Sequence, residues 1–214
     1  MVQRASIGTR SSIAQTAVIH QKRRLCVGRR VQIMDFAVIG LPNYYRDIFA
    51  KPEERIVRIG DDCRIYPWAL VYEGATLEAN VIMEERTTVG SRTSVGTRTR
   101  ILYQAQINDH ISVGQDCVVG GFVADNSRIG NKCSVFGSLV HSYANPDPTA
   151  WDITDEDGPV LEDHVFVGWG AVVVGNVRIG AGAWILPNSL VTENIPPGMK
   201  YGGRNTRASK PRKS

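Results

Sequence analysis

Four histidines are the side chains of this sequence best suited to accept a proton near neutral pH. His141 stands at the entrance to a segment rich in Asn, Pro and acidic residues, which makes it the first candidate for a general base. His110 is the second candidate, because the preceding Asp109 is placed to orient its imidazole. His164 takes the slot of a small inward residue in the repeat described next, so we expect a packed or corner histidine there. His20 has no neighbouring signal.

A six-residue repeat must position these side chains. From Ile59 to Val119 every sixth residue is large and apolar, and the fourth residue after each is small or β-branched, as at Cys63 and Ala69. Neither a helix with 3.6 residues per turn nor an alternating strand has this period. A short strand followed by a bend does, and three such units close a triangular coil whose neighbours stack. The repeat predicts an all-β left-handed parallel β-helix.

The pattern continues in shifted registers towards both ends and predicts seven or eight coils. We expect a β-helix domain over residues 1–195, interrupted by loops at about 41–56 and 142–158, and a C-terminal extension with a basic tail over 196–214. Interruptions of a regular scaffold are where function is expected. The second repeat position is often glycine, where we expect turns with positive φ. These glycines are Gly60, Gly90, Gly96 and Gly114.

Composition narrows the protein class. The net charge of +4 at pH 7 is mild, and much of it lies in the tail without a basic stripe or stacking aromatics, so no nucleic-acid partner is expected. The four cysteines form no CxxC pair, and Cys63, Cys117 and Cys133 occupy small interior slots, which favours packing over disulfides or metal binding. With neither a signal region nor a membrane span, we expect a cytoplasmic protein without a membrane partner.

Several segments carry a family resemblance. They read PVLEDHVFVG at 159–168, NVRIGAGA at 176–183, LVTENIPPG at 190–198 and RNTR at 204–207. In this order they look like the last coils, the proline-bearing exit and the final arginine of the hexapeptide-repeat acyltransferases, which the whole chain resembles. The segment VIMEERTTVG at 81–90 resembles more specifically the branch that acts on amino groups of nucleotide-linked sugars.

The resemblance implies an acetyl-CoA-dependent transferase that acetylates an amino group of a nucleotide-linked sugar. It also implies a homotrimer with clefts between prisms, a small-molecule substrate, and no metal. Lys200 or Arg204 would replace the charge of a lysine that the family often has where this chain has Glu193. The CoA-binding residues implied by the family pattern are Trp169, Pro187, Thr192, Lys200, Arg204 and Arg207.

For the acceptor, the resemblance implies Arg86 and the residues just inside the second loop, Tyr143, Asn145 and Asp147. The last three approximate the Asn and Asp that the amino-sugar branch places at the loop entrance. The base of sugar O-acetyltransferases would fall near residues 145–146, beyond His141. Catalysis without an essential side-chain base therefore stays open, because an amine needs less help than a hydroxyl once it is deprotonated.

Other functions remain as alternatives. An O-acetyltransferase of a sugar or antibiotic hydroxyl would use the same fold. A non-catalytic β-helix scaffold would use the repeat alone. A γ-type carbonic anhydrase needs three zinc-binding histidines, for which His110, His141 and His164 are available, but the close His-x4-His pair of that family is missing.

Overall fold

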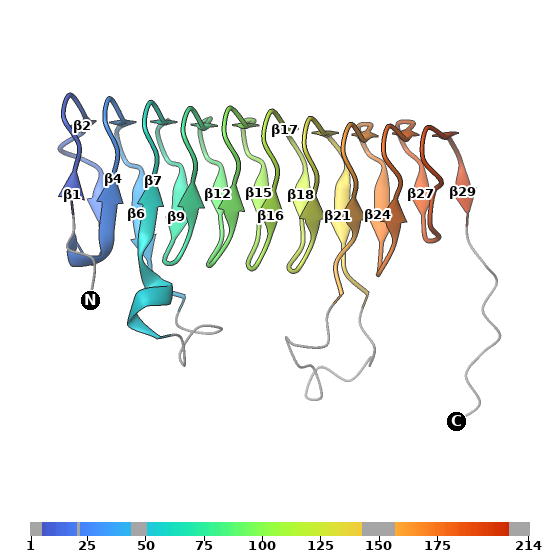
Figure 1. The fold of residues 1–214 in the computed structure, drawn as a ribbon, viewed down its shortest axis with the longest axis horizontal. Helices are drawn as coiled ribbons and strands as arrows, with labels where there is room; N and C mark the ends of the chain where they lie inside the picture. The colour runs from blue at the N-terminus through green and yellow to red at the C-terminus, as the bar shows by residue number, and fades with distance from the viewer. Residues whose placement is uncertain (1–5, 21, 44–50, 143–156, 206–214) are drawn as a thin grey trace.

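The computed structural model describes residues 6–20, 22–43, 51–142 and 157–205. Over these residues the chain winds into a left-handed β-helix with three parallel sheets, as predicted. Figure 1 shows the coils stacked side by side along one axis, with the described ends of the chain at opposite ends of the stack. The fold class predicted from the six-residue period is confirmed.

The strands fall into three sheets, named A, B and C in the order in which the chain visits them. Sheet A contains β1 (Ser6–Ile7), β4 (Leu25–Val27), β7 (Val57–Ile59), β10 (Thr76–Leu77), β13 (Ser94–Val95), β16 (Ser112–Val113), β19 (Arg128–Ile129), β22 (Val160–Leu161) and β25 (Arg178–Ile179). Sheet B contains β2 (Ser12–Ile13), β5 (Gln32–Ile33), β8 (Arg64–Ile65), β11 (Ile82–Met83), β14 (Arg100–Ile101), β17 (Val118–Val119), β20 (Ser134–Val135), β23 (Phe166–Val167), β26 (Trp184–Ile185) and β28 (Lys200–Tyr201).

Sheet C contains β3 (Val18–Ile19), β6 (Val38–Leu41), β9 (Leu70–Tyr72), β12 (Thr88–Val89), β15 (Gln106–Ile107), β18 (Phe122–Val123), β21 (Ser138–Val140), β24 (Val172–Val174), β27 (Leu190–Val191) and β29 (Arg204–Asn205). The prism therefore has three edges, A–B, B–C and C–A, named by the sheets that they join. Among the described residues the helices are two 3-10 segments, η1 (Lys22–Arg24) and η2 (Pro52–Arg55). Neither is long enough to cross a membrane.

The predicted seven or eight coils are too few, because sheets B and C each contain 10 strands. The difference lies at the ends, where the apolar pattern is weakest. At the N-terminus, the residues of β1 pair with β4 although Ile7 is 61% exposed. Beyond residue 195, β28 and β29 still pair with β26 and β27, inside the segment predicted as an extension.

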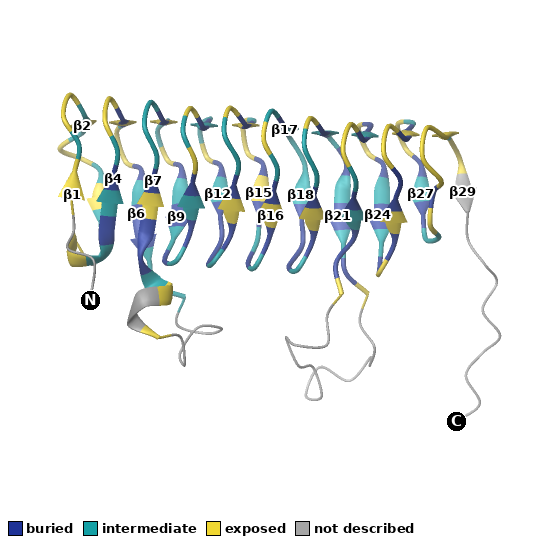
Figure 2. Cartoon of the chain, in the orientation of Figure 1, coloured by how far each residue is buried: buried dark blue, intermediate teal, exposed yellow. Residues whose placement is uncertain are grey.

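The interior is the apolar column that the repeat predicts. Each sixth residue from Ile59 to Val119 points inward and is buried, and so is the small residue that follows four positions later. Figure 2 shows buried residues running through the coils, with exposed residues mainly along the upper corners. A continuous apolar interior of this kind supplies most of the stability of a solenoid, since each coil buries its inward side chains against its neighbours.

The small interior slots that hold Thr and Cys also hydrogen-bond to the next coil. The Thr93 hydroxyl donates to the Asn108 carbonyl at 2.6 Å, and the Thr99 hydroxyl donates to Gly114 at 2.8 Å. The thiol of Cys63 contacts the Glu78 carbonyl at 2.9 Å. Burial raises the pKa of Cys63 to about 11, so it is a neutral thiol near pH 7. These contacts support the prediction that such cysteines are packing residues.

The role predicted for the second-position glycines is wrong. Gly60, Gly90, Gly96 and Gly114 do not have positive φ. They are required because the coils are close: a Cβ on Gly96 would lie 2.6 Å from the Gly114 carbonyl carbon, and one on Gly60 would lie 2.7 Å from the Ala79 nitrogen. Backbone atoms at these distances cannot give way, so a side chain is excluded by the neighbouring coil.

Positive φ occurs instead two residues later, mostly at residues other than glycine, such as Arg30 and Asp62. His164 is one of these corner residues, with φ of 62°, and it is exposed. The expectation that His164 takes an inward slot is therefore wrong, while a corner histidine is correct. Val165 fills the inward slot and is 1% exposed, because an apolar side chain suits the dry column better than imidazole.

We expect Val95→Asp to abolish folding. Its carboxylate would stand without a partner in an apolar column, at a cost comparable to the roughly 5–15 kcal/mol that holds a typical domain together. Circular dichroism and size-exclusion chromatography would measure the loss. The neighbouring Ser94→Asp is the matched control, because Ser94 points outward on the same strand. A stably folded Val95→Asp protein would contradict the inward register.

Substitutions at Gly96 and Gly182 distinguish two costs of replacing glycine: steric overlap with the neighbouring coil, and strain of a positive φ. We expect Gly96→Ala to cost about 3 kcal/mol, because its Cβ would overlap backbone atoms of Gly114. Gly182 has φ of +68° but nothing within 4 Å of a Cβ, so Gly182→Ala should cost only about 1 kcal/mol of left-handed strain. Chemical denaturation midpoints would measure both. The assignment fails if Gly182→Ala is the more destabilising change.

Candidate functional site

Both excursions leave the prism at the same edge. The first follows β6 of sheet C and returns to β7 of sheet A, and the second follows β21 of sheet C and returns to β22 of sheet A. Figure 1 shows the described ends of both segments on one side of the prism, with β9, β12, β15 and β18 between them. The C–A edge between the excursions is therefore the part of the surface that two interruptions of the repeat flank.

A column of buried polar side chains runs along this edge. Its members stand two residues after the inward residue of successive sheet C strands, and we call them the polar column. They are Glu73, Ser91, Asp109, Asp125 and His141. Each is at most 8% exposed. Burying a carboxylate costs free energy unless it is hydrogen-bonded. A row of buried polar side chains therefore needs hydrogen-bond donors along this edge.

The coils themselves supply the hydrogen bonds. Oδ1 of Asp109 accepts from the Ser91 backbone N–H at 2.7 Å, and Oδ1 of Asp125 accepts from the Asp109 backbone N–H at 2.9 Å. Each carboxylate thus receives a donor from the coil before it. A carboxylate held by a backbone N–H keeps a fixed orientation, which leaves its second oxygen available to face another group.

The first excursion is tied to the polar column at both ends. Before it, the Asn43 amide donates to Oδ2 of Asp109 at 2.8 Å. After it, Arg55 lies 3.3 Å from Oε1 of Glu73. Because Glu73 is almost fully buried, this ion pair is better shielded from water than one on the open surface. The ends of the first excursion therefore hold fixed positions relative to the column.

The second excursion returns against the same column. A Cβ on Gly158 would lie 2.5 Å from the Ser127 nitrogen and 2.6 Å from the Asp125 carbonyl oxygen. Only glycine allows so close an approach of backbone to backbone. Just before it, Oδ2 of Asp157 accepts from the Asn176 amide at 2.9 Å. His141 lies at the departure of this excursion and is 8% exposed.

A cavity of about 290 Å³ opens beside the middle of the column. Its walls include Asn43, Tyr72, Asn108, Asp109 and Asp125. Burial, and then the nearby Asp109 charge, raise the pKa of Tyr72, so its phenol is protonated and can donate a hydrogen bond near neutral pH. The cavity thus combines two carboxylates that attract cationic or donor groups with amides and a phenol that bind polar ligands.

The predicted bases both lie on this edge. His141 continues the polar column one coil beyond Asp125. His110 follows Asp109 at a corner with φ of 57° and is half-buried. The carboxylate oxygens of Asp109 accept from Ser91 and Asn43. His164 lies elsewhere, on the A–B edge between β22 and β23. In one chain the three histidines considered for zinc therefore do not share an edge.

The residues predicted to bind CoA lie mostly away from the polar column. Trp169 and Pro187 are exposed on neighbouring coils of the B–C edge, where the Asn188 N–H donates to the Trp169 carbonyl at 2.9 Å. Trp169 is 63% exposed, and its ring stacks on Phe136 at 5.5 Å. Lys200 is exposed on β28 beside Trp184 of β26.

The remaining predicted residues are spread over other places. Thr192 follows β27 at the end of the C–A edge, and Arg204 begins β29 in sheet C. Arg86 is exposed on the B–C edge, with φ of 60°, so within one chain it does not meet His141. The predicted Tyr143, Asn145, Asp147 and Arg207 lie outside the described residues.

Asp125 and the cavity residues Asn43 and Tyr72 are not among the site residues predicted from the sequence. The sequence does contain one indication of the polar column: Ser91 and Asp109 are 18 residues apart, which is the length of one coil, and so lie on the same edge. Asp125, however, comes only 16 residues after Asp109, because the corner between β17 and β18 is two residues shorter than the corners before it in the same coil. A search at a fixed spacing of one coil therefore passes over Asp125.

No family model matches the chain. In sequence it is 26% identical over 178 residues to the bifunctional protein GlmU of Nitrosospira multiformis, across 79% of this chain and 33% of that protein. It is also 46% identical over 43 residues to a UDP-3-O-acylglucosamine N-acyltransferase of a Methylobacterium species, across 20% of this chain and 12% of that protein. The chain thus spans a third or less of the length of these curated relatives.

Among solved structures, the UDP-N-acetylglucosamine acyltransferase from Campylobacter jejuni superposes with a TM-score of 0.48 at 16% identity, over 87% of this chain and 69% of that chain. A hexapeptide-repeat acetyltransferase from Vibrio cholerae superposes with a TM-score of 0.29 at 22% identity, over 68% and 66%. Likeness at this level adds nothing to the sequence matches. Together with the six-residue repeat, the sequence matches relate this chain to the hexapeptide-repeat acyltransferases.

Proposed function

We propose that this protein transfers an acetyl group from acetyl-CoA to the amino group of a nucleotide-linked sugar. The observation that carries the proposal is the polar column beside a cavity of about 290 Å³, at the edge from which both excursions leave. The Methylobacterium relative is a UDP-3-O-acylglucosamine N-acyltransferase, which supports nitrogen over oxygen as the accepting atom.

The cavity suits an amine acceptor. The carboxylates of Asp109 and Asp125 attract an ammonium group into the cavity and align it, while the Tyr72 phenol and the Asn43 amide bind sugar hydroxyls. His141, next in the column, takes the proton that the amine must lose. The amine nitrogen then forms a bond to the acetyl carbon as the carbon–sulfur bond breaks, and CoA leaves as a thiolate that takes up a proton.

Acetyl-CoA supplies the thioester, and the B–C edge has features that fit it. The exposed Trp169 is held by its stack on Phe136, which gives a rigid apolar wall for the pantetheine arm. Lys200 adds a positive charge near this wall for a phosphate group. Within one chain this edge and the polar column lie on opposite sides of sheet C, so a complete site requires the B–C edge of a neighbouring prism.

The outward face of sheet C supports such an assembly. It carries Val18, Val38, Leu70, Phe122, Val172 and Leu190, with the polar Thr88, Gln106 and Ser138 among them. The corresponding positions of sheet A include Arg58, Ser94, Ser112, Arg128 and Arg178. A sheet face with more apolar residues than its neighbour is typical of an interface. We infer a homotrimer in which the B–C edge of one prism meets the C–A edge of the next.

Calorimetry with acetyl-CoA, followed by mass spectrometry of reactions with a panel of nucleotide-linked amino sugars, tests the function. We expect CoA binding and a product heavier than the acceptor by one acetyl group. Hydroxyl acceptors of the same sugars distinguish N-acetylation from O-acetylation. If acetyl-CoA does not bind, the transferase proposal fails.

We expect His141→Ala to lower turnover by about 10²-fold with little change in CoA affinity, because it removes the group that takes the amine proton. The decisive measurement is turnover at saturating acetyl-CoA and amino sugar, compared with the Kd for CoA of the same variant. His164→Ala, on the A–B edge, is the matched control and should retain full activity. Near-normal turnover of His141→Ala would refute His141 as the base. The remaining mechanism would be one in which no side chain accepts the amine proton.

Asp109→Asn tests the acceptor site. The amide keeps one oxygen for the Ser91 N–H but presents an NH₂ group to the Asn43 amide, so the charge and one acceptor are lost together. We expect the KM for the amino sugar to rise at least about tenfold, while the Kd for CoA stays the same. Asp116→Asn, at a half-buried carboxylate paired with Arg98 on the A–B edge, is the control. An unchanged KM would remove Asp109 from the site.

A further inference from the structure

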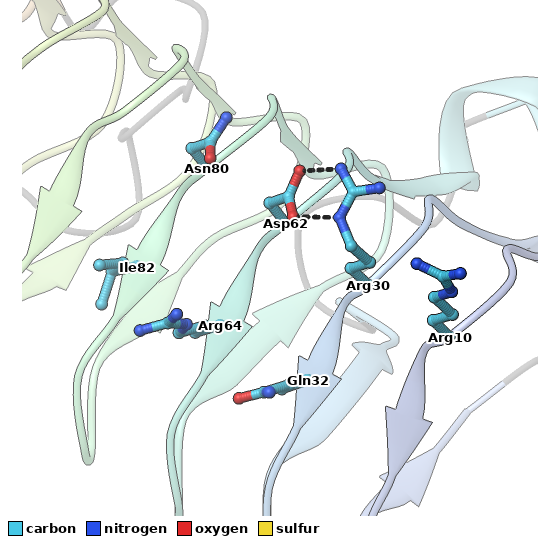
Figure 3. A pocket seen from close by; sticks show the side chains of 7 residues that line it. All are labelled: Arg10, Arg30, Gln32, Asp62, Arg64, Asn80 and Ile82. Atoms are coloured by element: carbon cyan, nitrogen blue, oxygen red, sulfur yellow. Dashed lines mark hydrogen bonds and ion pairs between the residues drawn. The ribbon is translucent and has the colours of Figure 1, made fainter.

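A second cavity lies far from the polar column in the fold. It has a volume of about 530 Å³ and lies where the A–B edge meets the outward face of sheet B, near the N-terminal end. Figure 3 shows Arg10, Arg30 and Asp62 at corners of successive coils, and Gln32 and Arg64 on neighbouring strands of the sheet. The stacking of the coils therefore gathers three arginines from three coils around one cavity.

Asp62 is the one carboxylate among the described residues that line this cavity, and it is already paired. Arg30 donates to Asp62 through two bonds, from Nε at 2.6 Å and from Nη2 at 2.5 Å. These bonds hold the pKa of Asp62 below its ordinary value. The same pairing recurs further along the edge, where Arg98 donates twice to Asp116. Asp62 thus balances Arg30 and leaves no carboxylate in the cavity wall for the other two arginines.

Arg10 and Arg64 are the uncompensated charges. Among the described residues, neither guanidinium makes a hydrogen bond or an ion pair, and both side chains are exposed. The next arginine along the outward face of sheet B, Arg100, is instead occupied by Glu84. Two free guanidiniums beside a neutral pair give the cavity a net positive charge and ten N–H donors without partners.

The rest of the wall suits a ligand larger than a simple ion. The amide of Gln32 flanks Arg64 on one side, and Ile82 flanks it on the other, in register along sheet B. Asn80 adds a second amide from the next corner. The cavity volume lies in the range of about 300–1,000 Å³ typical of small-molecule sites. One side is therefore cationic and polar, and the other presents an apolar surface.

We propose that this cavity binds a phosphate-bearing small molecule of nucleoside diphosphate size. Arg10 and Arg64 bind the phosphates, since a guanidinium fork matches two phosphate oxygens. Ile82 contacts the apolar face of the base, and the amides of Gln32 and Asn80 bind its polar edge. The site stands on the A–B edge and is independent of the acetyl-transfer proposal, because it shares no residue with the polar column.

Isothermal titration with inorganic pyrophosphate and with UDP tests the site on the intact chain. We expect both to bind, with UDP tighter. Arg10→Gln and Arg64→Gln should each weaken both ligands at least about tenfold, and raising the salt concentration should weaken them further. Arg128→Gln is the matched control, because Arg128 is an exposed arginine on sheet A that also makes no side-chain bond to a described residue. Ile82→Ala should weaken UDP and leave pyrophosphate unchanged.

The two ligands separate the parts of the proposal. If pyrophosphate does not bind, or binds equally to Arg10→Gln, Arg64→Gln and Arg128→Gln, the anion site is refuted. If UDP binds no tighter than pyrophosphate, the nucleoside part is refuted. UDP binding that is unaffected by both Arg10→Gln and Arg64→Gln would place the nucleotide elsewhere on the protein and would also overturn the assignment.

Discussion

The hydrogen bonds between the backbones of successive coils are the constraint on which the rest of the structure depends. The Thr76 N–H donates to the Thr93 carbonyl at 2.9 Å, and the Thr88 N–H donates to Ala105 at 3.0 Å. The same pattern recurs in all three sheets. Because it holds adjacent coils about 4.8 Å apart, each side chain stands directly over the residue one coil away. Residues of one kind therefore form columns, and the chemistry of each column follows from its place around the coil.

The polar column depends on the same spacing as the apolar interior. A buried carboxylate survives only if donors reach it. Here the donors are backbone N–H groups of a neighbouring coil, as for Asp109 and Asp125. On the A–B edge, Asp61 and Asp163 also accept backbone N–H groups, but the carboxylates there are more exposed to water, and Asp62 and Asp116 pair with arginine side chains. The C–A edge thus holds buried polar groups, and the A–B edge holds charges in contact with water.

The apolar period was sufficient to predict the fold and the inward register, because one inward residue in six is a strong constraint on its side-chain type. It did not predict why residue 96 is glycine. Close approach of a neighbouring backbone and a positive φ both select glycine, so the sequence does not distinguish these two causes. It misplaced His164 by one position, because corner and inward slots are adjacent. Asp125 was not predicted, because the shortened corner at Gly121 places it 16 residues, not 18, after Asp109. To predict that both excursions leave from the same edge, one must know which sheet each strand belongs to. The six-residue period alone does not give this assignment.

The departure of the two excursions from one edge also defines a length. Five coil steps along sheet C separate β6 from β21, which corresponds to about 24 Å at roughly 4.8 Å per step. Side-chain substitutions leave this separation unchanged, since the backbone hydrogen bonds set it. Only the gain or loss of a complete coil alters it, and such a change moves the segments by one whole step without rotating either from the C–A edge. The distance between the two excursions, and so the length of a molecule that could contact both, therefore changes only in steps of one coil. Duplication or deletion of a coil changes it, and point mutation does not.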